Sequence, residues 1–70
     1  MEPLDLTGLE PPGPMLEIMK GLEGLRSGET LAALLAREPV FLLPKLEEAG
    51  HGFTLRELGD GRWELRITKG

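Results

Sequence analysis

Cysteine is absent from this 70-residue chain, and its absence excludes several kinds of chemistry. Without a thiol there is no disulfide staple, no zinc–thiolate or iron–sulfur site and no cysteine nucleophile. A chain of this length buries only about 60% of the surface that its unfolded form exposes, so its core is small. Packing, alone or with self-association, must hold the fold together, and we expect a monomer or a weak homodimer.

An excess of positive charge is also missing, because 8 Lys and Arg residues stand against 12 Asp and Glu residues and the net charge is −4. Phosphate backbones attract basic surfaces, so this acidic balance disfavours binding to nucleic acid. A leucine- and glutamate-rich composition with few Asn, Gln and Ser residues is compatible with a thermophilic source.

Long apolar runs are absent as well, since the longest one covers only residues 31–36. That run is far too short to cross a membrane. The amino terminus reads Met-Glu-Pro-Leu-Asp, which lacks the basic and apolar regions of a secretory signal. We therefore expect a cytoplasmic protein without membrane contact.

The first half of the chain shows a change of apolar period. Leu4 and Leu6 alternate with polar residues and predict a short strand that ends at Gly8. From Pro14 onward, helical spacing predicts a helix that ends near Gly24, with its apolar face listed as Met15, Ile18, Met19 and Leu22. The run 30–36 is apolar on both faces. This pattern favours a central strand, although Ala and Leu also suit a helix.

The second half predicts a helix and a hairpin. The helix is expected over residues 39–49, with an irregular first turn because Pro44 cannot donate to the carbonyl of Val40, and its regular part is expected to start near Leu43. Phe53 and Leu55 indicate a third strand. The pair Asp60-Gly61 then predicts a turn into a strand over residues 62–68.

The order β-α-β-α-β-β places both helices on one face of a four-stranded mixed sheet. The predicted fold class is therefore α/β in the broad sense, an α+β two-layer sandwich. We expect residues 1–70 to form one domain.

The loop between the first strand and the first helix carries the most specific motif. Residues 5–15 read Asp-x-x-Gly-Leu-x-Pro-Pro-x-Pro-Met. This motif resembles the Asp-x-x-Gly-x-x-Cys-Pro-x-Pro signature of the TusA-like (SirA-like) sulfur carriers, which have the same size and element order. Glu38-Pro39, Pro44 and Gly50-His51-Gly52 fit that family's second helix and third strand.

The chain departs from the family motif at one residue, and this departure limits which of the family's functions the resemblance can imply. The sulfur-carrying cysteine falls at Pro11, which has no nucleophile, so sulfur relay by the family's chemistry is excluded. The chain is most similar to a cysteine-less branch of unknown function. In the carriers, partner enzymes approach the rim of this loop.

The proline-rich loop 8–15 is our candidate partner-binding site. A stiff, preordered apolar surface loses little entropy when it docks, whereas the prolines disfavour phosphate by removing N–H donors. The alternative is that the prolines only stiffen the turn. The predicted partner-binding residues are Leu9, Glu10, Pro11, Gly13 and Met15, and the predicted loop-shaping residues are Asp5, Gly8, Pro12 and Pro14.

The remaining polar residues do not predict chemistry. His51 is the single histidine and has no nucleophile pattern beside it, so we interpret it as a surface residue. Trp63, Met15 and Met19 are interpreted as core packing. Solvated surface positions are expected for Glu47, Glu48, Glu57, Asp60 and Glu64. We therefore expect no catalytic residue, no metal, no cofactor and no enzyme activity.

The arginines of the predicted hairpin suggest a second function, contact with RNA. Arg56, Arg62 and Arg66 suggest a stripe on the uncovered sheet face. The fold also resembles the C-terminal domain of translation initiation factor three, which contacts RNA. Against an RNA-contacting module stand the acidic total, the lack of exposed aromatics and Glu64 within the stripe.

Overall fold

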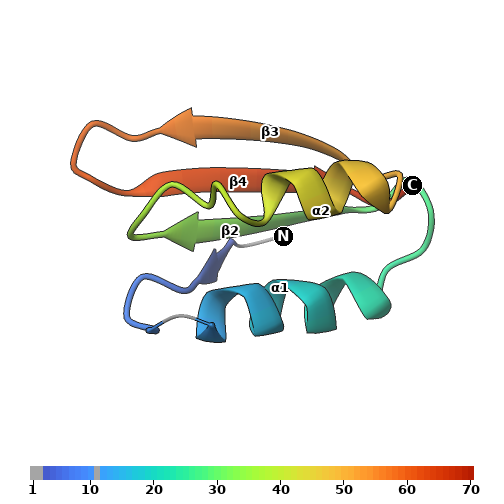
Figure 1. Cartoon of the computed structure of the whole chain (residues 1–70), viewed down its shortest axis with the longest axis horizontal. Helices are drawn as coiled ribbons and strands as arrows, with labels where there is room; N and C mark the ends of the chain where they lie inside the picture. The colour runs from blue at the N-terminus through green and yellow to red at the C-terminus, as the bar shows by residue number, and fades with distance from the viewer. Residues whose placement is uncertain (1–2, 11) are drawn as a thin grey trace.

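The computed structural model describes residues 3–10 and 12–70, and its elements follow the predicted order (Figure 1). They are β1 (Leu4–Asp5), α1 (Gly13–Glu23), β2 (Thr30–Leu35), α2 (Leu43–Glu48), β3 (Gly52–Glu57) and β4 (Trp63–Thr68). The predicted α+β fold class is confirmed.

The sheet has the strand order β1-β2-β4-β3. Strand β1 runs parallel to β2, whereas β4 pairs antiparallel with both β2 and β3, so the sheet is mixed as predicted. Strand β2 has a neighbour on each side, which confirms the central-strand interpretation of the run 30–36.

One face of the sheet carries the core. Side chains from β2 and β4 pack there against side chains from both helices, and Trp63 packs against this cluster at half burial. The members with less than 2% exposure are Ile18, Ala33, Leu46, Leu65 and Ile67. The opposite face is polar because alternate residues such as Arg66 and Thr68 point away from the core.

The two helices lie over different parts of the sheet. Helix α1 contacts β2 and α2 contacts β3, and no Cα atom of α1 lies within 8 Å of one in α2. Packed helices usually have axes 8–10 Å apart, so this pair is separated by more than direct packing allows. The helix layer is therefore open between α1 and α2.

Gly21 explains how α1 approaches the sheet. A Cβ atom at this position would lie 3.2 Å from Cδ2 of Leu31, which is tighter than ordinary van der Waals contact. The glycine weakens the helix intrinsically, and it lets the helix backbone pass close to the side chain of Leu31.

Several predicted boundaries need correction. Strand β2 ends at Leu35 and not at Ala36, and β4 begins at Trp63 and not at Arg62. Strand β1 ends at Asp5 and not at Gly8, because the chain turns at Thr7 and Gly8. Helix α1 begins at Gly13, one residue before the predicted start. Helix α2 covers only Leu43–Glu48 of the predicted range 39–49.

The shortening of α2 follows from its prolines. Residues 40–42 form turns in which Val40 N–H donates to Glu38 and Leu42 N–H donates to Pro39. Pro44 has no N–H to give to Val40, so the regular helix starts at Leu43. Val40 is consequently exposed and does not extend the core, and Met19 is exposed where core packing was expected.

The predicted hairpin between β3 and β4 is present. Its turn is longer than two residues: Leu58 N–H donates to the Arg62 carbonyl over 3.0 Å, and Gly59 and Gly61 adopt φ values of +87° and +88°. Among the described helices, none has the length and apolarity that crossing a bilayer requires.

Candidate functional site

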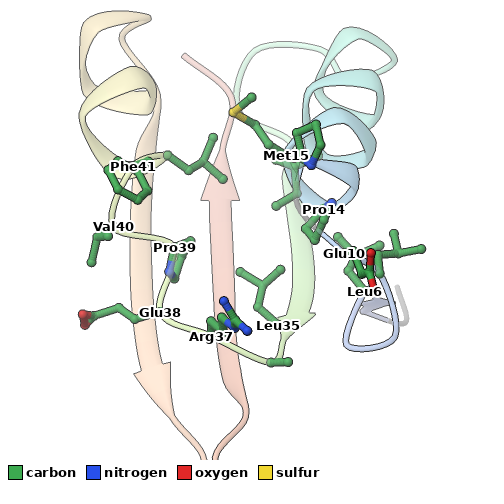
Figure 2. Close-up of a pocket in the computed structure, with 15 residues that line it drawn as sticks. Leu6, Glu10, Pro14, Met15, Leu35, Arg37, Glu38, Pro39, Val40 and Phe41 are labelled. Atoms are coloured by element: carbon green, nitrogen blue, oxygen red, sulfur yellow. The ribbon is translucent and has the colours of Figure 1, made fainter.

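The predicted proline-rich loop forms one wall of an apolar groove of about 450 Å³ (Figure 2). The other wall is the segment 36–42, which connects β2 to α2. Residues from β1, α1 and β2 complete the lining. The lining residues are Leu6, Leu9, Glu10, Pro12, Pro14, Met15, Ile18, Leu35, Ala36, Arg37, Glu38, Pro39, Val40, Phe41 and Leu42.

The parallel pairing of β1 and β2 brings the two walls together. Leu4 lies opposite Ala33 and Asp5 opposite Leu34, so both strands end at the same edge of the sheet. Beyond the paired residues, Leu6 N–H donates to the carbonyl of Leu34 over 2.9 Å. The loop that follows β1 and the segment that follows β2 therefore start side by side.

Three of the four described residues that were predicted to bind a partner line this groove, and Gly13 does not. Leu9, Glu10 and Met15 line it, and Met15 also packs against the core. Gly13 opens α1, and a Cβ atom added to it would lie 3.4 Å from Cβ of Leu9. Pro11 lies outside the described residues.

The predicted loop-shaping residues divide into two groups. Pro12 and Pro14 line the groove, whereas Gly8 is exposed with open space where a Cβ atom would be. Asp5 lies just before the loop and accepts hydrogen bonds from Oγ1 and N–H of Thr7, at 2.6 and 3.1 Å.

The bonds from the side chain and backbone of Thr7 hold the pKa of Asp5 below its ordinary value of 3.8, and the charge of Arg62 lowers it further. The carboxylate thus stabilises the turn at Thr7, and its effect on the shape of the whole loop stays a prediction.

The amino terminus of α1 offers few donors to an anion. Pro12 and Pro14 have no N–H, and the N–H groups of Gly13 and Leu16 donate to Glu10 and Pro12 over 2.8 and 3.1 Å. A helix start holds phosphate through free backbone N–H groups. This helix start therefore has few of the free N–H donors that a phosphate would need.

Sequence reasoning missed the second wall of the groove. Phe41 is 85% exposed and Val40 is 49% exposed, although the sequence predicts both within the helix over residues 39–49. The available signal was the run of four apolar residues at 40–43 between Pro39 and Pro44. A helix presents such a run in all directions, so its members cannot all face one core.

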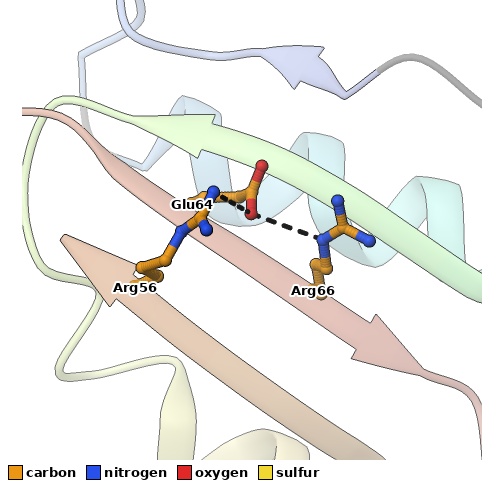
Figure 3. Close-up of polar contacts among 3 residues, drawn as sticks. All are labelled: Arg56, Glu64 and Arg66. Atoms are coloured by element: carbon orange, nitrogen blue, oxygen red, sulfur yellow. Dashed lines mark hydrogen bonds and ion pairs between the residues drawn. The ribbon is translucent and has the colours of Figure 1, made fainter. Parts of the chain in front are cut away.

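The arginines of the open sheet face are held by carboxylates (Figure 3). Arg56 and Arg66 lie on either side of Glu64, at 3.4 and 3.3 Å from its Oε1 atom. Arg62 instead pairs with Asp60 at the hairpin turn over 2.8 Å, and this bond lowers the pKa of Asp60. Two of the three arginines therefore share one half-buried carboxylate.

At the end of the fold opposite the groove, hydrogen bonds join residues that are far apart in the sequence. Lys69 Nζ donates to the carbonyls of Leu22 and Leu25, both over 2.7 Å, at the carboxyl end of α1. Nδ1 of His51 accepts a bond from Gly70 N–H over 3.0 Å. Within residues 3–10 and 12–70, no cluster of three His, Asp or Glu side chains is arranged to hold a metal ion.

The fold and the groove together define a small α+β protein whose most distinctive surface feature is apolar. Residues 3–69 match the model of a family described as an uncharacterized conserved protein (DUF2249), and the chain belongs to this family. A comparison with curated proteins found no match.

Proposed function

We propose that this protein is a non-enzymatic binding module that docks a partner protein on the rim of the apolar groove. The observation that carries the proposal is the exposure of three apolar side chains around the groove: Phe41, Val40 and Leu9, at 85%, 49% and 45%. Exposed apolar side chains that gather at one concave site mark an interaction surface more often than scattered ones do.

The walls of the groove also favour docking. Pro12, Pro14 and Pro39 restrict the backbone on both sides, so the surface loses little conformational entropy when a partner binds. A large aromatic side chain such as Phe41 contributes strongly to binding when a partner buries it.

The composition of the groove favours binding over catalysis. Among the described residues that line it, the charged ones are Glu10, Arg37 and Glu38, and none is Ser, Thr or His. A nucleophile with an adjacent base therefore has no counterpart in this lining.

The proposal includes a distant relation to the TusA-like sulfur carriers. The motif of residues 5–15 supports it, because partner enzymes of those carriers approach the corresponding loop. Pro11 stands where the carriers have cysteine, so docking is the part of their function that this chain can retain.

A cross-linked capture experiment tests the docking surface. Wild type is compared with the double variant Leu9→Ala/Phe41→Ala, which removes two exposed side chains from the rim. The matched control is Leu16→Ala/Met19→Ala, which removes two exposed apolar side chains of α1 that do not line the groove. Circular dichroism checks that all three proteins are folded.

We expect wild type and the control to capture the same partner and the rim variant to lose it. Equal capture by the rim variant, or loss by both variants, would overturn the proposal that the rim is the docking surface.

A further inference from the structure

We infer that the groove also binds a small amphipathic carboxylate, with its apolar body between the two walls and its carboxylate on Arg37. This inference does not rest on the proposed function. The ligand would lie inside the groove, whereas a docked partner is proposed to contact the rim.

The size and lining of the groove suit a small molecule. Sites for small ligands measure about 300–1,000 Å³ and are mostly apolar with a few polar groups. The groove has a volume of about 450 Å³, and twelve of its fifteen lining residues are uncharged and apolar. Leu6, Ile18 and Leu42 are buried and line its inner surface, while Met15 supplies a flexible side chain that can adapt to a ligand.

Arg37 provides the charge that selects the head of the ligand. Within the described part of the chain, its side chain makes no hydrogen bond and no ion pair, whereas Arg56, Arg62 and Arg66 each have a carboxylate partner. In Figure 2 the side chain of Arg37 lies at the lower edge of the lining residues, between Pro39 and Leu35, while the carboxylate of Glu38 points outward. Glu10 lies on the opposite wall, near Leu6.

The rest of the site favours a carboxylate over a phosphate. A guanidinium group matches the two oxygens of a carboxylate with two parallel N–H bonds. A phosphate ester carries more oxygens and more charge, and it is usually held by additional backbone N–H donors. At the nearest helix start, Pro12 and Pro14 have none, and those of Gly13 and Leu16 already donate to backbone carbonyls.

Three eight-carbon probes with different head groups test this inference on the full chain, and the carboxylate probe has the alkyl tail that is one carbon shorter, so tail length does not favour it. They are octanoate, octanol and octylammonium, each titrated against protein with labelled methyl groups. The methyl signals of Met15 and Leu42 report on the groove, and the saturation of their shifts gives the dissociation constant.

We expect octanoate to bind up to about fivefold more tightly than octanol, which is the range for one exposed ion pair, and octylammonium to bind most weakly. Arg37→Gln should remove the preference of octanoate over octanol and leave octanol binding unchanged. The matched control Arg26→Gln, which removes an exposed arginine beyond the far end of α1, should keep the preference.

The inference is overturned if no probe produces saturable shifts at Met15 and Leu42. It is also overturned if octanol or octylammonium binds as tightly as octanoate, or if the preference for octanoate survives Arg37→Gln. Because the probe series on wild type needs no variant, the test stands even if a substitution perturbs folding. A partner can still be captured when octanoate does not bind, and octanoate can still bind when no partner is captured. The results therefore distinguish failure of the docking proposal from failure of the ligand proposal.

Discussion

At the scale of single residues, Phe41 and Leu42 are sequence neighbours with opposite surroundings. Phe41 is 85% exposed at the groove, while Leu42 is 4% exposed and belongs to the core. The turn over residues 40–42 produces this difference, because successive side chains leave it in different directions. The two positions therefore separate a surface role from a packing role.

Phe41→Ala should change the free energy of unfolding by less than about 0.5 kcal/mol, because an exposed side chain contributes little to packing. Leu42→Ala should lower it by about 2–5 kcal/mol, because it removes buried methyl groups and leaves a cavity. Urea unfolding of both variants measures these changes. A loss for Phe41→Ala as large as that for Leu42→Ala would mean that Phe41 is part of the core.

Asp5 gives the turn at Thr7 a dependence on pH. Its pKa is lowered in the folded protein, so its contribution to stability is fully present above its ordinary pKa of 3.8 and is lost as the pH falls through the folded value. Asp5→Asn keeps an oxygen acceptor but removes the charge. Wild type should therefore be more stable than Asp5→Asn at pH 7, and the difference should be smaller at pH 3, below the ordinary pKa of 3.8.

Urea unfolding of the two proteins at both pH values measures this difference. Asp60→Asn serves as a comparison, because Arg62 lowers the pKa of Asp60 in the same direction. A difference between wild type and Asp5→Asn that stays constant from pH 7 to pH 3 would contradict the ionic role of Asp5.

At the scale of elements, the position of α1 depends on the absence of a side chain at Gly21. Gly21→Val should lower the free energy of unfolding by about 1–3 kcal/mol, because its methyl groups would overlap Leu31. Lys20→Val is the matched control, since it places the same poor helix former on an exposed position of α1. Thermal unfolding compares them. Because valine is a better helix former than glycine, propensity alone would stabilise Gly21→Val, so a Gly21→Val variant at least as stable as wild type would contradict the close approach to Leu31.

Several elements could be predicted because local patterns and the final structure agree. Strands β2 and β4 and the hairpin follow from apolar periodicity and turn residues, and the mixed four-stranded sheet follows from the rules for crossover connections. The spatial order of the strands was not predicted. The start of α2 at Leu43 followed from Pro44, which lacks the N–H that an earlier helix would need.

The groove could be predicted only in part. Its first wall was visible as a proline-rich motif. To predict the second wall, one must know that β1 pairs parallel with β2 and that the segment 40–42 turns outward. Local sequence patterns indicate neither. The opening between α1 and α2 is a property of tertiary packing, so no sequence period reports it.

At the scale of the whole molecule, charge argues against RNA contact. The net charge is −4, and the arginines of the hairpin are paired with Glu64 and Asp60. Binding to a phosphate backbone depends on free cations and weakens with salt. A single-stranded RNA should therefore keep its electrophoretic mobility at low salt in the presence of the protein. A salt-sensitive shift, lost in Arg56→Gln/Arg66→Gln, would contradict this expectation.

We propose that a partner docks on one face of this molecule, the rim of the groove. Site-specific photo-cross-linking tests it most directly, with a photoreactive phenylalanine analogue placed at Phe41 or, as the control, at Thr54 on the open sheet face. If the rim is the docking site, position 41 gives one dominant adduct in cells and position 54 gives none. The same adducts from both positions, or adducts from position 54 alone, would contradict it.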